Sequence, residues 1–167
     1  VGVSSTQAVL GMDCLQHYCI QLDFESRRIR FLDPDAAAAD AAALGKEFPL
    51  KSRPQASIDH PGILQERRTT LIVDTGDALD GRVPVEVLRS KARLGHAERL
   101  PLNPDTPIPP GLIHPLLFSE VRWDDRTYRD VIVGPGPNLL GLRFLGRYRR
   151  VTFNFPRGRL YLDSGNE

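Results

Sequence analysis

The sequence predicts a mostly β protein, built as a small closed β barrel with short helices. Glycine and proline number 14 each among the 167 residues, which is typical of a turn-rich chain. The short helices expected here follow aliphatic-aliphatic-glycine elements. Strands and helices show no regular alternation, which disfavours an α/β sheet. Hydrophobic residues make up 41 % of the chain, enough to form a core.

The first part of the chain predicts a short helix, two strands and a second helix. The first helix is expected over about 12–17, and the strands near 18–24 and 27–32. Asp33-Pro34 then opens an alanine tract that ends at Gly45. Proline in the first turn and glycine after the last turn are typical of a short helix. With few apolar anchors and no heptad pattern, we expect a weakly packed connector rather than a coiled coil.

The remaining elements follow from apolar runs and their proline and glycine boundaries. Pro84 suits the first turn of a helix, and four prolines within 103–111 exclude a regular element there. The expected elements are, in order, strands 48–53, 55–59 and 68–74, a helix over 85–92, an extended loop over 103–111, strands 116–123 and 127–133, a helix over 143–147, and strands 148–155 and 159–162.

The start of the chain repeats its end. Each copy reads as a short helix followed by a two-stranded hairpin. We interpret residues 1–33 as the tail of a first lobe, whose remainder is expected upstream of Val1. The alternative is a chance similarity between two amphipathic β segments. The matching segments are 9–18 with 139–148, 22–24 with 153–155, and 28–31 with 159–162.

Two sequence blocks carry the candidate chemistry. Asp74-Thr75-Gly76 follows the apolar run Leu71-Ile72-Val73, and the second block, 131–141, reads VIVGPGPNLLG. A carboxylate at the end of a buried strand, followed by a glycine that permits a tight turn, presents an acid at the floor of a cleft. The tripeptide alone occurs by chance in ordinary turns, whereas the pair of blocks at this spacing is a specific signal.

These blocks resemble the retropepsin-like aspartic proteases, a family of retroviral and pepsin-like type. The resemblance covers roughly residues 66–162 and is poorest over 88–115. It implies a closed barrel of the acid-protease type, preceded by the C-terminal fragment of a similar lobe. The implied organisation is a lobe tail over 1–33, a linker helix over 34–46, and a lobe over 47–167 that carries the Asp-Thr-Gly motif.

The resemblance also implies a mechanism. In the family, two aspartates from two lobes share one proton and activate a water that hydrolyses the peptide bond of a peptide or protein substrate, without a cofactor. By resemblance, Asp74 is the aspartate of this lobe, Thr75 ties the two active-site loops together, and Gly76 lets the loop approach the axis. Supporting residues would pack beneath that loop, namely Leu139, Leu140 and Gly141.

This chain contains one Asp-Thr-Gly, so the second aspartate must come from another lobe or from a homodimer partner. Asp77 stands where the family usually has alanine or serine, and a second acid there would make ionisation of Asp74 more costly. The alternative function is therefore an inactive domain of the same fold that binds peptide or mediates assembly. A purely structural lobe is a third possibility. The family's mobile flap would fall at 94–96 or 103–111.

Composition argues against several other functions. The net charge of +1 gives no electrostatic case for nucleic acid, no run of about eighteen apolar residues could span a membrane, and the four histidines lack metal-ligand spacing. We expect Cys14 and Cys19 to be buried thiols, with a disulfide or a metal site as alternatives. A basic cluster near the end is expected to consist of solvated side chains, namely Arg143, Arg147, Arg149 and Arg150.

Overall fold

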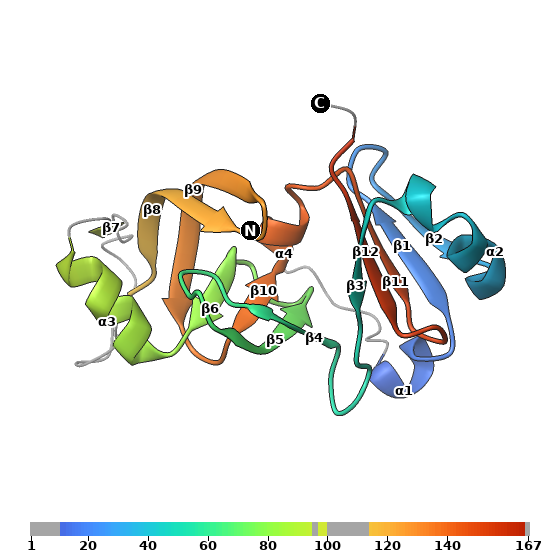
Figure 1. Cartoon of the computed structure of the whole chain (residues 1–167), viewed down its shortest axis with the longest axis horizontal. Coiled ribbons are helices and arrows are strands. Elements are labelled where there is room, and N and C mark those ends of the chain that lie inside the picture. The colour runs from blue at the N-terminus through green and yellow to red at the C-terminus, as the bar shows by residue number, and fades with distance from the viewer. Residues whose placement is uncertain (1–10, 95–96, 100–113, 166–167) are drawn as a thin grey trace, which may run out of the picture. The chain divides into compact units, whose positions relative to one another are not determined.

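The computed structural model describes residues 11–94, 97–99 and 114–165 (Figure 1). The fold is mostly β, with 46 % strand and 20 % helix in two sheets, as the sequence predicted. The chain divides into two compact units. Unit 1 comprises residues 1–56 and 149–167, and unit 2 comprises residues 57–148. This division cuts across the three segments expected from the sequence, because both ends of the chain belong to unit 1.

Unit 1 is built on a five-stranded antiparallel sheet with the strand order β2-β1-β11-β12-β3. Strands from the two ends of the chain meet at its centre, where β1 pairs with β11 (Figure 1). The short helix α1 (Met12–Leu15) precedes β1, as expected. The strands are β1 (Cys19–Asp23), β2 (Arg28–Leu32), β3 (Lys46–Pro49), β11 (Arg150–Asn154) and β12 (Arg159–Asp163).

The alanine tract packs against this sheet, which corrects the prediction of a weakly packed connector. It forms α2 (Pro34–Ala39) and the 3-10 helix η1 (Ala41–Leu44). The side chain of Asp33 caps α2 by accepting hydrogen bonds from the backbone N–H groups of residues 35 (2.9 Å) and 36 (2.8 Å). Buried side chains then join the tract to the sheet, namely Ala37, Leu44, Cys19 and Tyr161. The small alanine side chains let the tract lie close to the sheet. The hydrophobicity of the sequence alone did not reveal this packing.

The register of unit 1 follows the sequence repeat. Gln21 lies opposite Thr152, and these two residues occupy equivalent positions in the two copies. The pairing Cys19↔Leu32 within the first hairpin has its counterpart in Arg150↔Asp163 within the second. The hairpins are therefore related by a local twofold axis that passes between Gln21 and Thr152. The Gln21 Nε2 atom donates a hydrogen bond to Thr152 Oγ1 (3.0 Å), so both buried side chains have a partner.

Unit 2 is built on a seven-stranded mixed sheet with the strand order β4-β5-β10-β6-β9-β8-β7. Only the pairs β5–β10 and β6–β9 are parallel. The strands are β4 (Ser57–Pro61), β5 (Arg68–Asp74), β6 (Gly81–Val83), β7 (Ala97–Arg99), β8 (Leu116–Trp123), β9 (Arg126–Pro135) and β10 (Leu139–Gly141). The helices are α3 (Val85–Arg93) and α4 (Leu142–Leu145).

The expected closed barrel is not found in the described part of the chain. The sheet of unit 2 has two edge strands, β4 and β7, and each of them pairs on one side only. Closure into a barrel would need a continuous ring of hydrogen-bonded strands. The strands β6 and β7 have three residues each and were not expected from the sequence, because so short a segment shows no alternation.

Aromatic rings fill the part of the unit 2 core beneath α4. Phe144 is fully buried and contacts Trp123 and Tyr128, with ring centroids 5.1 and 4.8 Å apart. The hydroxyl groups of Tyr128 and Tyr148 share a hydrogen bond of 2.5 Å. Burial raises the pKa of both tyrosines. These contacts hold α4 against the β8–β9 hairpin.

The two cysteines differ in environment. Both are free thiols, but Cys14 is exposed on α1 and Cys19 is buried at the start of β1. The prediction of two buried thiols is therefore right only for Cys19. Burial, and then the nearby Asp33 carboxylate, raise the pKa of the Cys19 thiol to about 11.

This difference predicts selective alkylation. In the folded chain at about pH 8, iodoacetamide should modify Cys14 and leave Cys19 unmodified, because a thiol with so high a pKa is almost entirely protonated and is also covered. Mass spectrometry of tryptic peptides measures the two sites separately. Both cysteines should react in denaturant, and equal modification in the folded chain would contradict the environment described for Cys19.

Candidate functional site

The two sequence blocks that carry the candidate chemistry lie side by side in unit 2. Asp74 is the last residue of β5, and the parallel strand β10 places Gly141 opposite it. The same register sets Leu139 beside Ile72 and Leu140 beside Val73. Because the two strands run in the same direction, their carboxyl ends lie next to each other at the same end of the sheet. Asp74 is thus held at that end of the sheet by a strand that is buried at Leu71 and Val73 and that pairs with β10.

Only glycine fits at position 141. A Cβ atom there would lie 2.2 Å from the carbonyl oxygen of Leu79 and 2.9 Å from that of Asp77. Leu139 and Leu140 are buried, with β5 on one side of β10 and β6 on the other. The absent side chain lets the loop after Asp74 fold directly against the end of β10.

The Asp74 carboxylate is held by its own turn. Its Oδ1 atom accepts a hydrogen bond from the backbone N–H of Gly76 (2.8 Å). Asp74 is half-buried, whereas Thr75 and Gly76 are exposed. The arrangement presents a carboxylate from a rigid strand end with its turn open to solvent, which suits proton transfer to or from a bound group.

Asp77 is neutralised inside the same loop. One oxygen of its carboxylate accepts a hydrogen bond from the backbone N–H of Leu79 (2.9 Å), and the other pairs with Nε of Arg82. The Asp77 side chain is only 7 % exposed. The sequence suggested that this second acid would make Asp74 more costly to ionise. The Arg82 guanidinium instead offsets its charge, so Asp77 acts as a structural brace of the loop.

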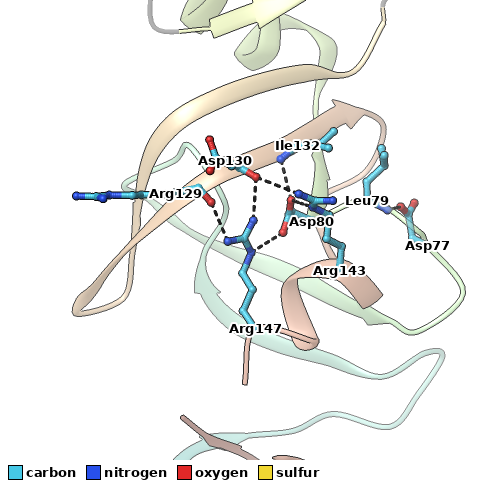
Figure 2. Close-up of polar contacts among 8 residues, drawn as sticks. All are labelled: Asp77, Leu79, Asp80, Arg129, Asp130, Ile132, Arg143 and Arg147. Atoms are coloured by element: carbon cyan, nitrogen blue, oxygen red, sulfur yellow. Dashed lines mark hydrogen bonds and ion pairs between the residues drawn. The ribbon is translucent and has the colours of Figure 1, made fainter. Parts of the chain in front are cut away.

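A buried carboxylate, that of Asp80, lies at the centre of the contacts that hold the loop after Asp74 (Figure 2). Asp80 is 0 % exposed. Its Oδ2 atom accepts hydrogen bonds from the backbone N–H of Ile132 (2.8 Å) and from Nε of Arg143 (3.0 Å). Its Oδ1 atom accepts one from Nε of Arg147 (2.7 Å). Charge-assisted hydrogen bonds from two arginines and an amide compensate the desolvation of this charge.

Backbone hydrogen bonds around Asp80 also join the loop to β9 and to the end of β10. The N–H of Asp80 donates to the carbonyl of Ile132 (3.1 Å), and its own carbonyl accepts from the N–H of Gly141 (2.9 Å). Next to it, the N–H of Leu142 donates to the carbonyl of Asp77 (2.7 Å). The loop after Asp74 is therefore fixed to β9, to the end of β10 and to the start of α4.

Sequence reasoning missed this network. The basic cluster was expected to consist of solvated side chains. Instead Arg143 and Arg147 bind Asp80, and Arg147 also donates to the carbonyls of Arg129 (2.8 Å) and Asp130 (2.9 Å) (Figure 2). The available signal was the four-residue spacing of the two arginines, which would place them on one face of the helix predicted over 143–147, although α4 ends at Leu145 and Arg147 lies in the turn after it.

The other two arginines of the cluster belong to unit 1. Arg149 and Arg150 both pair with Asp163, at 2.9 and 2.7 Å. Although burial raises the pKa of Asp163, hydrogen bonds from the N–H of Gly165 and from the two guanidinium groups lower it overall. All four arginines therefore pair with a buried carboxylate, which the sequence did not indicate, while Arg143 remains exposed and the other three are half-buried.

The expected flap cannot be placed. Residues 95–96 and 103–111 lie outside the described residues, and Leu94 is exposed at the end of α3. A hollow of about 720 Å³ lies elsewhere in unit 2 and is lined by His60, Gln65, Trp123 and Asp124, among others. Neither Asp74 nor any other residue of the two sequence blocks lines it, so it does not belong to the candidate site.

Within the described ranges, no group of three or more His, Cys, Asp or Glu residues is placed to hold a metal ion. In the same part of the chain, no helix is long and apolar enough to cross a membrane.

Comparison with known proteins adds no assignment. No protein-family model matches the chain, and no curated protein matches its sequence. The function of the site is therefore argued from its residues and their geometry.

The buried network predicts a large effect of Asp80→Asn. The substitution removes the charge that two arginines bind, but these arginines are 47 % and 23 % exposed and water can solvate them, so unit 2 should lose about 1–3 kcal/mol of stability. Fluorescence of Trp123, the single tryptophan and a core residue of unit 2, can follow unfolding in urea.

A matched control is Glu120→Gln, the same kind of change at an exposed position of β8 in the same unit. It should change the stability by no more than about 0.5 kcal/mol. Equal effects of the two substitutions would show that the buried pairing of Asp80 does not hold unit 2 together.

Proposed function

We propose that unit 2 belongs to an aspartic endopeptidase lobe of the retropepsin type, which hydrolyses peptide bonds with a water activated by two aspartates. Asp74 supplies one of them, and the other comes from a second lobe or from another protomer. The observation that carries this proposal is the parallel pairing that sets Asp74 beside Gly141, at the carboxyl ends of β5 and the buried strand β10. We further propose that unit 2, with part of unit 1, forms a lobe of the acid-protease type.

The chemistry requires two carboxylates that share a proton. At hydrogen-bonding distance both cannot be ionised, so one stays protonated. The ionised carboxylate takes a proton from the attacking water, and the protonated one polarises the carbonyl of the scissile peptide bond. No covalent intermediate forms and no cofactor is needed. Peptides or proteins are the substrate class.

The residues around Asp74 have separate roles in this proposal. The N–H of Gly76 holds one oxygen of the Asp74 carboxylate, and the exposed Thr75 is available to bind the equivalent loop of the second lobe. Leu139, Leu140 and Gly141 pack beside the strand that carries Asp74. The pairs of Asp77 and Asp80 with arginines keep the loop fixed, so the carboxylate is positioned before substrate binds.

A second candidate function is a catalytically inactive domain of the same fold that binds peptide or mediates assembly. The observation in its favour is that the sequence contains one Asp-Thr-Gly, so the chain by itself supplies a single motif aspartate. This function would keep peptide binding without hydrolysis.

Substitution at Asp74 separates the two functions. The two-lobed form should cleave an unfolded protein substrate at acidic pH, and a pepstatin-type inhibitor should block cleavage. Asp74→Asn should lower the rate by about a thousandfold or more, because the dyad loses its ionisable member. Peptide mapping by mass spectrometry measures cleavage.

The control variant Glu120→Gln should cleave at the wild-type rate. Unchanged cleavage by Asp74→Asn would contradict the catalytic assignment. Peptide binding without cleavage by the wild-type two-lobed form would favour the inactive domain.

A further inference from the structure

The sheet of unit 1 is symmetric except at one edge. The local twofold axis relates β1 to β11 and β2 to β12. On the outer side of β12 lies β3, with Phe48 opposite Leu160 and Glu47 opposite Tyr161. In the described part of the chain, β2 pairs with β1 alone. The position related to β3 by the twofold axis is therefore the outer edge of β2.

Equivalent side chains of the two hairpins differ sharply in burial. Ile29 and Phe31 of β2 are 67 % and 60 % exposed, whereas Leu160 and Leu162, their counterparts in β12, are 0 % and 2 % exposed. Both members of each pair are large apolar side chains. The sequence of β2 thus encodes a buried strand face that this chain leaves exposed.

A third side chain extends this apolar surface. Tyr18 is 47 % exposed, and its ring contacts that of Phe31 edge to face, with centroids 5.6 Å apart. Its counterpart in the second copy, Tyr148, is 5 % exposed. Three of the five large apolar side chains that are exposed in the described residues therefore gather beside this one edge. Such a cluster next to an unpaired strand is typical of an interaction surface.

We propose that the edge of β2, with Tyr18, Ile29 and Phe31, is the docking surface for the lobe that α1, β1 and β2 complete. The occupant is the preceding part of the same polypeptide. Its first strand pairs antiparallel with β2, as β3 pairs with β12, and the body of that lobe covers the apolar side chains. This proposal rests on the proposed two-lobed function and names the surface that joins the second lobe.

The chemistry of the docking strand follows from β3. Glu47 binds Arg159 at 2.8 Å, and the counterpart of Arg159 in the first copy is Arg28. The docking strand should therefore carry an acid opposite Arg30, within reach of Arg28, and a large apolar side chain opposite Ile29. Charge and shape would then match the exposed strand as they do at β12.

A second copy of the chain fits this surface less well. In each copy, β11 and β12 follow unit 2 directly, and β11 already pairs with that copy's own β1. The place beside β11 that the last two strands of a second lobe would occupy is therefore taken by β1 and β2 of the same chain. The missing lobe must be the one whose last two strands are β1 and β2. Only the polypeptide that leads into α1 meets this condition.

Hydrogen–deuterium exchange tests the docking surface directly. The 167-residue chain is compared with the polypeptide extended upstream of Val1 by one lobe. In the extended form, the β2 amides that point away from β1 should exchange at least about tenfold more slowly. The amides of β12, which are paired on both sides in each form, serve as the internal standard.

Substitutions locate the contact. The double variant Ile29→Lys and Phe31→Lys should abolish the added protection of β2 in the extended form and leave β12 unchanged. The matched control Leu94→Lys alters an apolar side chain that is 62 % exposed in unit 2, and it should keep the protection.

Three results would overturn the proposal. The first is equal exchange of β2 in the two forms. The second is an upstream sequence without a strand of the expected pattern. The third is a dimer of the 167-residue chain that the double lysine variant dissociates, because the occupant would then be a second copy.

Asp74→Asn separates this proposal from the catalytic one. In the extended form it should abolish cleavage and keep the protection of β2. Protection of β2 without any wild-type cleavage would leave the docking surface standing while the catalytic proposal fails, and cleavage without protection would do the reverse.

Discussion

The buried carboxylate of Asp80 is the constraint on which the candidate site depends. A charge that is 0 % exposed is tolerated only when it is fully paired, and Asp80 has two arginines and a backbone amide as partners. Its partners come from β9, from α4 and from the turn after α4, and its own carbonyl accepts a hydrogen bond from Gly141 at the end of β10. One side chain and its backbone thus fix three elements around the loop that follows Asp74.

Two properties of the site follow from this constraint. The loop approaches the end of β10 so closely that position 141 has no room for a side chain. The acids of the loop also separate into different roles, because Asp77 and Asp80 are paired with arginines while Asp74 lies half-buried at a turn that is open to solvent. A site that keeps one carboxylate accessible and neutralises its neighbours is suited to acid–base chemistry. The same preference for paired polar groups appears in unit 1, where Gln21 and Thr152 meet at the local twofold axis.

The parts of this structure that could be predicted from the sequence are those encoded by local patterns. The apolar run before Asp74 indicated β5, and the two copies of the helix-hairpin segment indicated strands that the structure pairs with each other. The spacing of Arg143 and Arg147 indicated that the two arginines act together, but their pairing with Asp80 could not be predicted, because a carboxylate more than sixty residues away carries no local signal. The open edges of the unit 2 sheet were also missed, since the hydrophobic pattern of a strand does not specify whether its sheet closes. Packing of the alanine tract was missed because small side chains contribute little hydrophobic signal.

The central claim is that Asp74 is half of a proton-sharing pair whose other half lies on a second lobe. A crystal structure of the two-lobed polypeptide measures this most directly, through the distance from the Asp74 carboxylate to the nearest carboxylate of the other lobe. The account predicts an oxygen–oxygen separation of about 3 Å, across an axis that relates the two Asp-Thr-Gly turns. An Asp74 side chain that faces bulk solvent, with no carboxylate of another lobe within hydrogen-bonding distance, would contradict it.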